Sequence, residues 1–333
     1  MSMNNKFSPN VRGIHIYIKE RNRDITRDSK IKGLGDKSAD FEEVKVPVPW
    51  GVIAGKWWGP KTVQPAIAIH GWQDNSGTFD NLAPLLKEKG LSLFCIDLPG
   101  HGFSSHLPKG QNYYLFWDGV PILRRIVKHF GWKEITIIGH SLGGCVAFMY
   151  AAAYPDDVKK YVSIDIAGPS VRDPKKMLEA IGTSVDKFLE YEKKTVDDMP
   201  CYNYEEMINI VVDAHKGSVT REGCEIMMRR GMAPVGETKR YLFTRDPRLK
   251  VSSLGFMTID EVLLFASRIT CEVMNIRAES GLTLDNPGHY SMILEEIEKS
   301  AKKLERHLVP GTHHLHLNNG ESVASIIYDF LVS

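Results

Sequence analysis

The chain has 333 residues, of which 43% are hydrophobic, and this is ample apolar material for a large buried core. Its net charge of +1 gives no indication of nucleic acid or another polyanion as a partner, and none is predicted. No apolar run reaches the roughly 18 residues that a membrane helix needs, so no integral membrane segment is expected.

The two ends of the chain and its cysteines favour a cytoplasmic protein. The first residues, MSMNNKFSPNVRG, lack the apolar segment of a secretory signal. The last three, LVS, are not the S-K-L type of peroxisomal signal, although an association with peroxisomes or vesicles is left open. Five scattered cysteines without a CxxC pair are typical of reduced thiols. The oligomeric state is not predicted.

The first part of the chain changes character near residue 40. Residues 1–40 carry mixed charge and few core residues, which predicts a mobile tail with one short strand over 14–18. Residues 43–48 alternate with period two, and 51–58 are the expected hairpin partner. Strand and helix patterns then alternate: strands at 66–70, 91–97, 135–138 and 161–165, and helices at 79–88, 113–130 and 142–154. Near-continuous apolar strands in this order predict a mainly parallel sheet with helices on both faces.

The alternation stops between residues 169 and 267. Only helical patterns are found there, at 175–191, 204–215, 220–230 and 258–268, with no convincing strand. Strand and helix patterns resume at 271–276, 290–303 and 304–309, and a last helix is expected at 321–331. We therefore expect an α/β core formed by residues 41–168 and 268–333, with a helical cap over 169–267.

A serine between glycines marks the end of one predicted strand. Residues 138–144 read IGHSLGG, so a G-x-S-x-G pattern lies between an apolar strand and an amphipathic helix. This pattern in this context is the nucleophile elbow, a turn so tight that its flanking positions cannot carry large side chains. The turn strains the serine backbone and exposes its hydroxyl at the end of the sheet. Ser141 is therefore the predicted nucleophile.

A serine nucleophile needs a base, and the base needs an orienting acid. In this architecture the order along the chain is serine, acid, histidine, which places the base after the last strand. Three histidines compete there: His313, His314 and His316. A metal site is the rival interpretation, but no carboxylate or cysteine is expected to join this cluster closely, so no metal is predicted.

The oxyanion of an acyl-transfer intermediate needs two backbone N–H donors. One should come from Leu142, which follows the nucleophile, and the other from Trp72 in the loop after the strand at 66–70. Gly71 allows the backbone to approach closely, and His70, Gly71 and His140 are expected to line the pocket. His101, in a glycine-rich turn beside the site, is expected to be a hydrogen-bonded loop residue and not a base.

These motifs together resemble the α/β-hydrolase superfamily. They are HGW at 70–72, DLPGHGFS at 97–104, GHSLGG at 139–144 and GTHHLHL at 311–317. Four further stretches are similar to the serine hydrolase-like proteins, including the kraken-like members of insects: VPVPWGVIAGKWWGP (46–60), HGWQDNSGTFDNLAPLL (70–86), RDPRLK (245–250) and ITCEVMNIRAESG (269–281). The resemblance covers residues 43–333 and implies an α/β-hydrolase fold with a helical cap.

The resemblance implies a choice among the histidines and leaves the acid open. The family's closing pattern places its catalytic histidine at position 313. The usual position of the acid, after the strand at 273–276, is filled by Gly281. Asp165, at the end of another strand, matches a position that some members use for the acid. Glu279, Asp285 or no acid at all are the alternatives, and Asp165 could instead be a structural cap.

The sequence therefore predicts a serine hydrolase that cleaves a small-molecule ester or a related acyl compound through an acyl-enzyme. No metal or organic cofactor is implied. Aspartate-nucleophile chemistry is disfavoured because position 141 is serine. The alternative is a non-catalytic small-molecule-binding or interaction protein on the same scaffold, because a fold alone does not decide function. The natural substrate and its acyl chain are not predicted.

Overall fold

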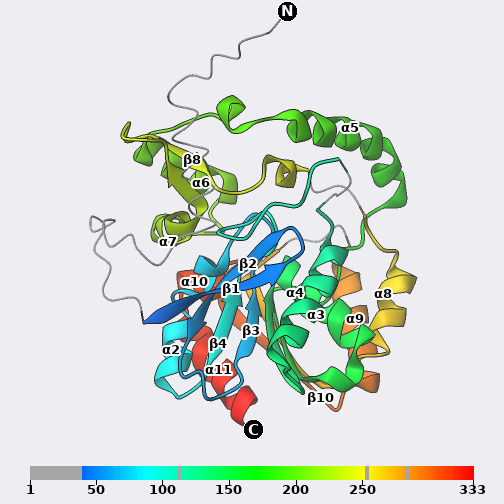
Figure 1. Ribbon diagram of the computed structural model, residues 1–333. Coiled ribbons are helices and arrows are strands. Elements are labelled where there is room, and N and C mark those ends of the chain that lie inside the picture. The colour runs from blue at the N-terminus through cyan, green and yellow to red at the C-terminus, as the bar shows by residue number, and fades with distance from the viewer. Residues whose placement is uncertain (1–39, 111–113, 252–254, 283–285) are drawn as a thin grey trace, which may run out of the picture.

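A computed structural model describes residues 40–110, 114–251, 255–282 and 286–333. Its centre is an eight-stranded sheet in the order β1-β2-β4-β3-β5-β6-β9-β10, shown in Figure 1. β2 is antiparallel to β1 and β4, and the other neighbours are parallel. The strands are β1 Phe41–Val48, β2 Gly51–Trp58, β3 Ala66–Ile69, β4 Leu93–Ile96, β5 Ile135–His140, β6 Val158–Ile164, β9 Glu272–Ser280 and β10 Lys303–Thr312. The prediction of a mostly parallel sheet is confirmed.

Helices cover both faces of the sheet (Figure 1). One face packs against α3 Gly119–Phe130, α4 Leu142–Ala153, α8 Ile259–Ala266 and α9 Pro287–Ser300. The other packs against α2 Ala83–Glu88 and α11 Glu321–Val332. The central strands β3 and β4 are therefore buried along their whole length, which explains their continuous apolar sequences. The short helices are η1 Ser76–Phe79, η2 Phe116–Asp118, η3 Pro155–Asp157 and α10 Leu315–Asn318.

A cap lies beyond one end of the strands (Figure 1). It contains α5 Pro174–Lys193, η4 Val196–Asp198, α6 Tyr204–His215, α7 Arg221–Gly231, β7 Met232–Pro234, β8 Tyr241–Phe243 and η5 Pro247–Lys250. The expectation that this segment lacks strands was wrong, because β7 and β8 form an antiparallel pair. Three-residue strands are too short to show an alternating pattern in the sequence.

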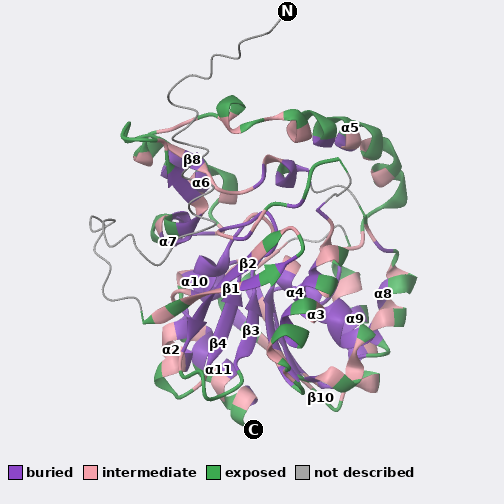
Figure 2. Cartoon of the chain, in the orientation of Figure 1, coloured by how far each residue is buried: buried purple, intermediate pink, exposed green. Residues whose placement is uncertain are grey.

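The cap has a small core of its own. Four buried methionines, Met207, Met227, Met228 and Met232, pack there with other apolar side chains of α6 and α7. The burial of the helices differs between the cap and the core (Figure 2). The cap helix α5 is largely exposed along its length, whereas the core helix α4 is almost fully buried against the sheet. The flexible methionine side chains fill the narrow space between short cap elements.

The end of the cap differs from the expected boundary. The helix α8, assigned to the cap on sequence, places Val262 and Ala266 in the main core beside α4 and α9. We therefore draw the end of the cap before α8. The first helices of the core are also shorter than expected, because η1 and η2 precede α2 and α3. The strand expected at 14–18 lies outside the described residues.

None of the helices in the described ranges combines the length and the apolar character that crossing a membrane requires.

Candidate active site

The serine of the G-x-S-x-G motif lies at the junction of β5 and α4. Ser141 has φ 50° and ψ −114°, a left-handed conformation that is unusual for a residue other than glycine. A Cβ atom on Gly139 would lie 2.4 Å from the Gly143 carbonyl oxygen, and one on Gly143 would lie 1.9 Å from the Ile69 carbonyl oxygen. Glycine is therefore required on both sides of Ser141, as expected for a nucleophile elbow.

We expect the Gly143→Ala variant to lose stability, because its methyl group would collide with the β3 backbone and force the elbow to shift. Overpacking of this kind costs about 1–3 kcal/mol, measured as the free energy of unfolding in urea. Gly182→Ala in α5 is the matched control, since a Cβ atom there meets nothing within 4 Å. That variant should be as stable as the wild type or slightly more stable. Equal stability of the Gly143→Ala variant would contradict the packing of the elbow.

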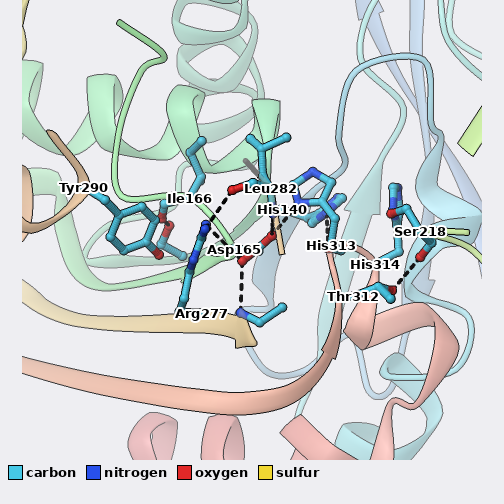
Figure 3. A network of polar contacts seen from close by, with 12 residues as sticks. His140, Asp165, Ile166, Ser218, Arg277, Leu282, Tyr290, Thr312, His313 and His314 are labelled. Carbon is cyan, nitrogen blue, oxygen red and sulfur yellow. Dashed lines mark hydrogen bonds and ion pairs between the residues drawn. The ribbon is translucent and has the colours of Figure 1, made fainter. Parts of the chain in front are cut away.

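The structure brings His313 and Asp165 together from distant parts of the chain (Figure 3). Asp165 directly follows β6, and His313 directly follows β10. The Nδ1 atom of His313 lies 2.6 Å from Oδ2 of Asp165, within hydrogen-bond distance. Of the three competing histidines, His313 alone has this contact with Asp165 among the described residues. An Nδ1–H donated to the carboxylate leaves Nε2 of a neutral His313 as the basic nitrogen.

Backbone and side-chain donors hold the Asp165 carboxylate in place. The Ala278 N–H donates to Oδ1 at 2.9 Å and the Leu282 N–H donates to Oδ2 at 2.7 Å. The Arg277 guanidinium lies 3.3 Å from Oδ1. Burial alone would raise the pKa of Asp165, but the bond with His313 and the two backbone donors lower it below its usual value. The carboxylate is therefore charged at neutral pH and can orient an imidazole.

Gly281 occupies the position where the family pattern usually has the acid, and the structure gives a steric reason for the glycine. A Cβ atom on Gly281 would lie 2.2 Å from Oδ1 of Asp165, so the two positions compete for one space. Glu279, the alternative acid, is exposed near the end of β9. Asp285, the other alternative, lies outside the described residues. The geometry therefore favours Asp165 over Glu279.

The expected oxyanion donors lie at the start of α4 and in the loop after β3. Leu142 is the first residue of α4, so its N–H has no intrahelical partner. In the other loop, the Gln73 N–H donates to Nε2 of His101 at 3.1 Å and the Asp74 N–H donates to the Gly71 carbonyl at 3.2 Å. The N–H of Trp72, which precedes Gln73, has no acceptor among the described residues. It remains the predicted second donor.

His101 and His140 act as neutral hydrogen-bonding groups. Burial lowers the pKa of each to about 3. His101 Nδ1 lies 2.9 Å from the Pro99 carbonyl, which agrees with the expected role in shaping its loop. His140 Nε2 lies 2.9 Å from the His313 carbonyl and thereby helps to fix the backbone that carries the base.

A cavity of about 230 Å³ opens at Ser141 between the core and the cap. Its lining is Gly71, Trp72, Gln73, Asp74, His140, Ser141, Ile210, Val211, Ala214, His215, Arg245, His313 and His314. Gly71 and His140 therefore lie where the sequence placed them, but His70 does not line this cavity. Its ring is fully buried, with Nδ1 2.7 Å from the Gly71 carbonyl and Nε2 accepting the Leu98 N–H at 3.0 Å, so it braces two loops instead.

Sequence reasoning missed Asp74, His215 and Arg245 at this cavity. The argument that no carboxylate joins the histidine cluster was wrong, because Oδ2 of Asp74 lies 3.2 Å from Nε2 of His314. Asp74 and His314 are 240 positions apart in the sequence. The available signal was that Asp74 follows β3 and His314 follows β10, and loops after parallel strands meet at one edge of the sheet.

Comparison with known proteins agrees with the fold. Residues 65–199 match the family described as α/β hydrolase fold. The chain is 48% identical to a probable serine hydrolase of Drosophila melanogaster, over 90% of this chain and 89% of that protein. The chain belongs to the α/β-hydrolase family, in its serine hydrolase-like branch. A serine hydrolase-like protein of Danio rerio is 36% identical over 87% of this chain and 88% of its own length.

Two solved structures have a fold similar to that of this chain. A hypothetical protein of Pseudomonas aeruginosa has 30% identity and a TM-score of 0.75, covering 88% of this chain and all of that one. The thioesterase domain from the curacin biosynthetic pathway has 18% identity and a TM-score of 0.71, covering 88% and 99%. The second likeness concerns the fold alone. The family and the names of its members support a hydrolase.

Proposed function

We propose that this chain hydrolyses a carboxylic ester or a related acyl compound through an acyl-enzyme on Ser141. The observation that carries the proposal is the bond between His313 Nδ1 and Asp165 Oδ2 on the edge of the sheet where the Ser141 elbow lies. Ser141, Asp165 and His313 follow one another in the nucleophile, acid, base order that this fold uses. The small-molecule substrate would bind in the cavity of about 230 Å³, which includes Ser141 and His313 in its lining.

In the first half of the reaction, the Ser141 hydroxyl attacks the substrate carbonyl carbon, and Nε2 of His313 takes the hydroxyl proton. Asp165 holds the Nδ1–H tautomer and stabilises the imidazolium that forms. The carbonyl oxygen becomes an oxyanion, for which the N–H groups of Trp72 and Leu142 are the proposed donors. When the intermediate collapses, the alcohol leaves with the proton from His313, and the acyl group stays on Ser141.

In the second half, a water molecule replaces the alcohol. His313 removes a proton from this water as it attacks the acyl carbon, and a second oxyanion forms in the same place. Collapse of this intermediate breaks the bond to Ser141 and returns the proton to its oxygen. The products are a carboxylic acid and the regenerated enzyme, so this chemistry requires neither a metal nor an organic cofactor.

Labelling with a fluorophosphonate probe tests this proposal, because such probes react with an activated serine and not with ordinary hydroxyls. Wild-type protein should take up one probe per chain by intact mass, and Ser141→Ala should take up none. Ser325→Ala, which changes an exposed serine on α11, is the control and should be labelled like the wild type. p-Nitrophenyl acyl esters provide the parallel measurement of turnover.

Two results would overturn the proposal. One is a wild-type protein that neither reacts with the probe nor cleaves any ester above the rate of the Ser141→Ala variant. This result would favour the non-catalytic alternative, a binding protein on the same scaffold. The other is equal labelling of the Ser141→Ala variant, which would place the reactive serine elsewhere.

A further inference from the structure

A second group of polar side chains lies beside the candidate triad. Asp74 follows β3, His314 follows β10, and His215 ends the cap helix α6. Oδ2 of Asp74 lies 3.2 Å from Nε2 of His314, and Oδ1 lies 3.8 Å from Nε2 of His215. One ligand atom from each residue lies within 4.8 Å of the other two. Core and cap thus direct a carboxylate and two imidazoles at one point.

The outer hydrogen bond of His215 directs a lone pair toward this point, and that of His314 is compatible with the same tautomer. His215 Nδ1 lies 2.8 Å from the Val211 carbonyl, which can only accept, so Nδ1 carries the hydrogen and Nε2 is free in the neutral ring. His314 Nδ1 lies 2.7 Å from the Ser218 hydroxyl, which can accept its hydrogen in the same way. Metal-binding histidines have this arrangement, in which the second nitrogen donates to a protein acceptor.

An unpaired buried nitrogen beside Asp74 is an independent observation at this point. His140 Nε2 donates to the His313 carbonyl, which leaves Nδ1 as an acceptor. This Nδ1 faces Oδ2 of Asp74 at 3.5 Å and has no hydrogen-bond partner. His140 is fully buried, and Asp74 is 4% exposed. Acceptors that face each other in a buried place are unfavourable unless a cation or a proton lies near them.

We propose that Asp74, His215 and His314 bind a divalent transition-metal ion of the Zn²⁺ type. Zinc bonds of about 2.0–2.1 Å at a tetrahedral angle place neighbouring ligand atoms about 3.3–3.4 Å apart. The distances of 3.2 Å to Oδ2 and 3.8 Å to Oδ1 of Asp74 are near this value, and side-chain shifts that bring one oxygen to both imidazoles would complete the site. Two imidazoles and one carboxylate are a donor set that suits zinc. The fourth position faces the cavity that all three residues line.

The proposed ion would act on the cap and on the neighbouring base. It would join α6 to the loops after β3 and β10, and this link should stabilise the folded chain. The rings of His313 and His314 are 5.2 Å apart between centroids, so the ion would bring positive charge close to His313. If His313 is the base of the proposed reaction, bound metal would oppose formation of its imidazolium and slow turnover.

The positive charge of Arg245 should weaken binding of a cation at this site. Arg245 lines the same cavity and interacts electrostatically with Asp74. Its guanidinium must move or tolerate a nearby cation when metal binds. Removing this charge should therefore tighten binding, whereas a loss of ligands should weaken it.

Titration calorimetry with Zn²⁺ on the full chain tests the site, with the Ser141→Ala variant in parallel so that the result does not depend on catalysis. Both proteins should bind one Zn²⁺ per chain and melt several degrees higher with it. His215→Gln should weaken binding at least tenfold, and Arg245→Gln should strengthen it. His129→Gln, at an exposed position on α3, is the matched control and should bind like the wild type. Co²⁺ should give the visible absorption of a tetrahedral site.

The proposal is overturned if the wild type shows no saturable Zn²⁺ binding, or if His215→Gln and His129→Gln bind equally well. In the first case the cluster is a buried ion pair between Asp74 and a protonated His215. Asp74→Asn is a second ligand variant, and its binding should also fall if it folds. His215 lies at a partly exposed cap position, so its variant keeps the test valid when Asp74→Asn does not fold.

Discussion

We expect the Asp165→Asn variant to lose about four orders of magnitude in kcat, as is typical when the acid of such a triad becomes an amide. The carboxylate accepts hydrogen bonds on both oxygens, from Ala278 on one and from Leu282 and His313 on the other, and Arg277 forms an ion pair with the first. An amide has only one accepting oxygen. Whichever way it turns, its NH₂ group faces a donor, and the Nδ1–H tautomer of His313 loses support. Ester turnover by the purified variant measures the effect.

The choice of acid has its own control. Glu279→Gln changes the exposed alternative and should leave kcat within a factor of about two of the wild type. Near-normal turnover of the Asp165→Asn variant would reject Asp165 as the acid. A large loss in the Glu279→Gln variant would transfer the role to Glu279.

Moving the carboxylate from position 165 to position 281 is a second test of the acid. Gly281→Asp alone should be inactive or unstable, because its Cβ atom would lie 2.2 Å from Oδ1 of Asp165. The double variant Asp165→Gly with Gly281→Asp removes that collision, and glycine suits the φ of 54° at position 165. We expect it to be at least tenfold faster than Asp165→Gly alone. No recovery would mean that position 281 cannot reach His313.

We expect the Arg230→Ala variant to lose about 3–5 kcal/mol of unfolding free energy, because it leaves buried carboxylate charge without a partner. Arg230 lies in the cap helix α7 and is 2% exposed. Its Nε donates to Oδ2 of Asp97 at 2.8 Å, and its two other nitrogens bond the carboxylate of Glu43 in β1. Asp97 follows β4 and is fully buried. Denaturant unfolding followed by circular dichroism measures the loss.

The neighbouring residue provides the control for this prediction. Arg229→Ala removes an exposed arginine from the same helix turn and should change stability by less than about 0.5 kcal/mol. Arg230→Lys should restore only part of the loss, because an ammonium cannot bond both carboxylates with the planar geometry of a guanidinium. If Arg230→Ala and Arg229→Ala unfold alike, the ion pair does not hold the cap to the sheet.

The features that depend on neighbours in the sequence could be predicted well. The elbow needs only the strand of β5, the glycines around Ser141 and the start of α4, and all of these lie within a few residues. The continuous apolar strands likewise revealed a sheet buried on both faces. The pair β7 and β8 was missed, because three residues in each strand carry no periodic signal and the pairing depends on tertiary contacts.

The sequence could rank the candidates for the acid and the base that accompany Ser141, but it could not show which of them are in contact. Asp165 and His313 are 148 positions apart, and their contact depends on the order of β6, β9 and β10 in the sheet. Gly281 at the family's usual acid position left the acid open on sequence, and the geometry explains the glycine, since the Asp165 carboxylate occupies the space of a side chain at position 281. Nothing local pointed to Asp74 as the partner of His314.

The sequence by itself determined the α/β-hydrolase architecture, the position of Ser141 in its strained turn and the loop that carries His313, because backbone sterics and apolar periodicity act over a few residues. The tertiary structure decided which carboxylate meets which histidine: Asp165 with His313, and Asp74 with His314 and His215. These pairings arise where loops from separate strands and the cap converge. A side chain's partners there are set by distance in space, and the sequence does not encode that distance locally.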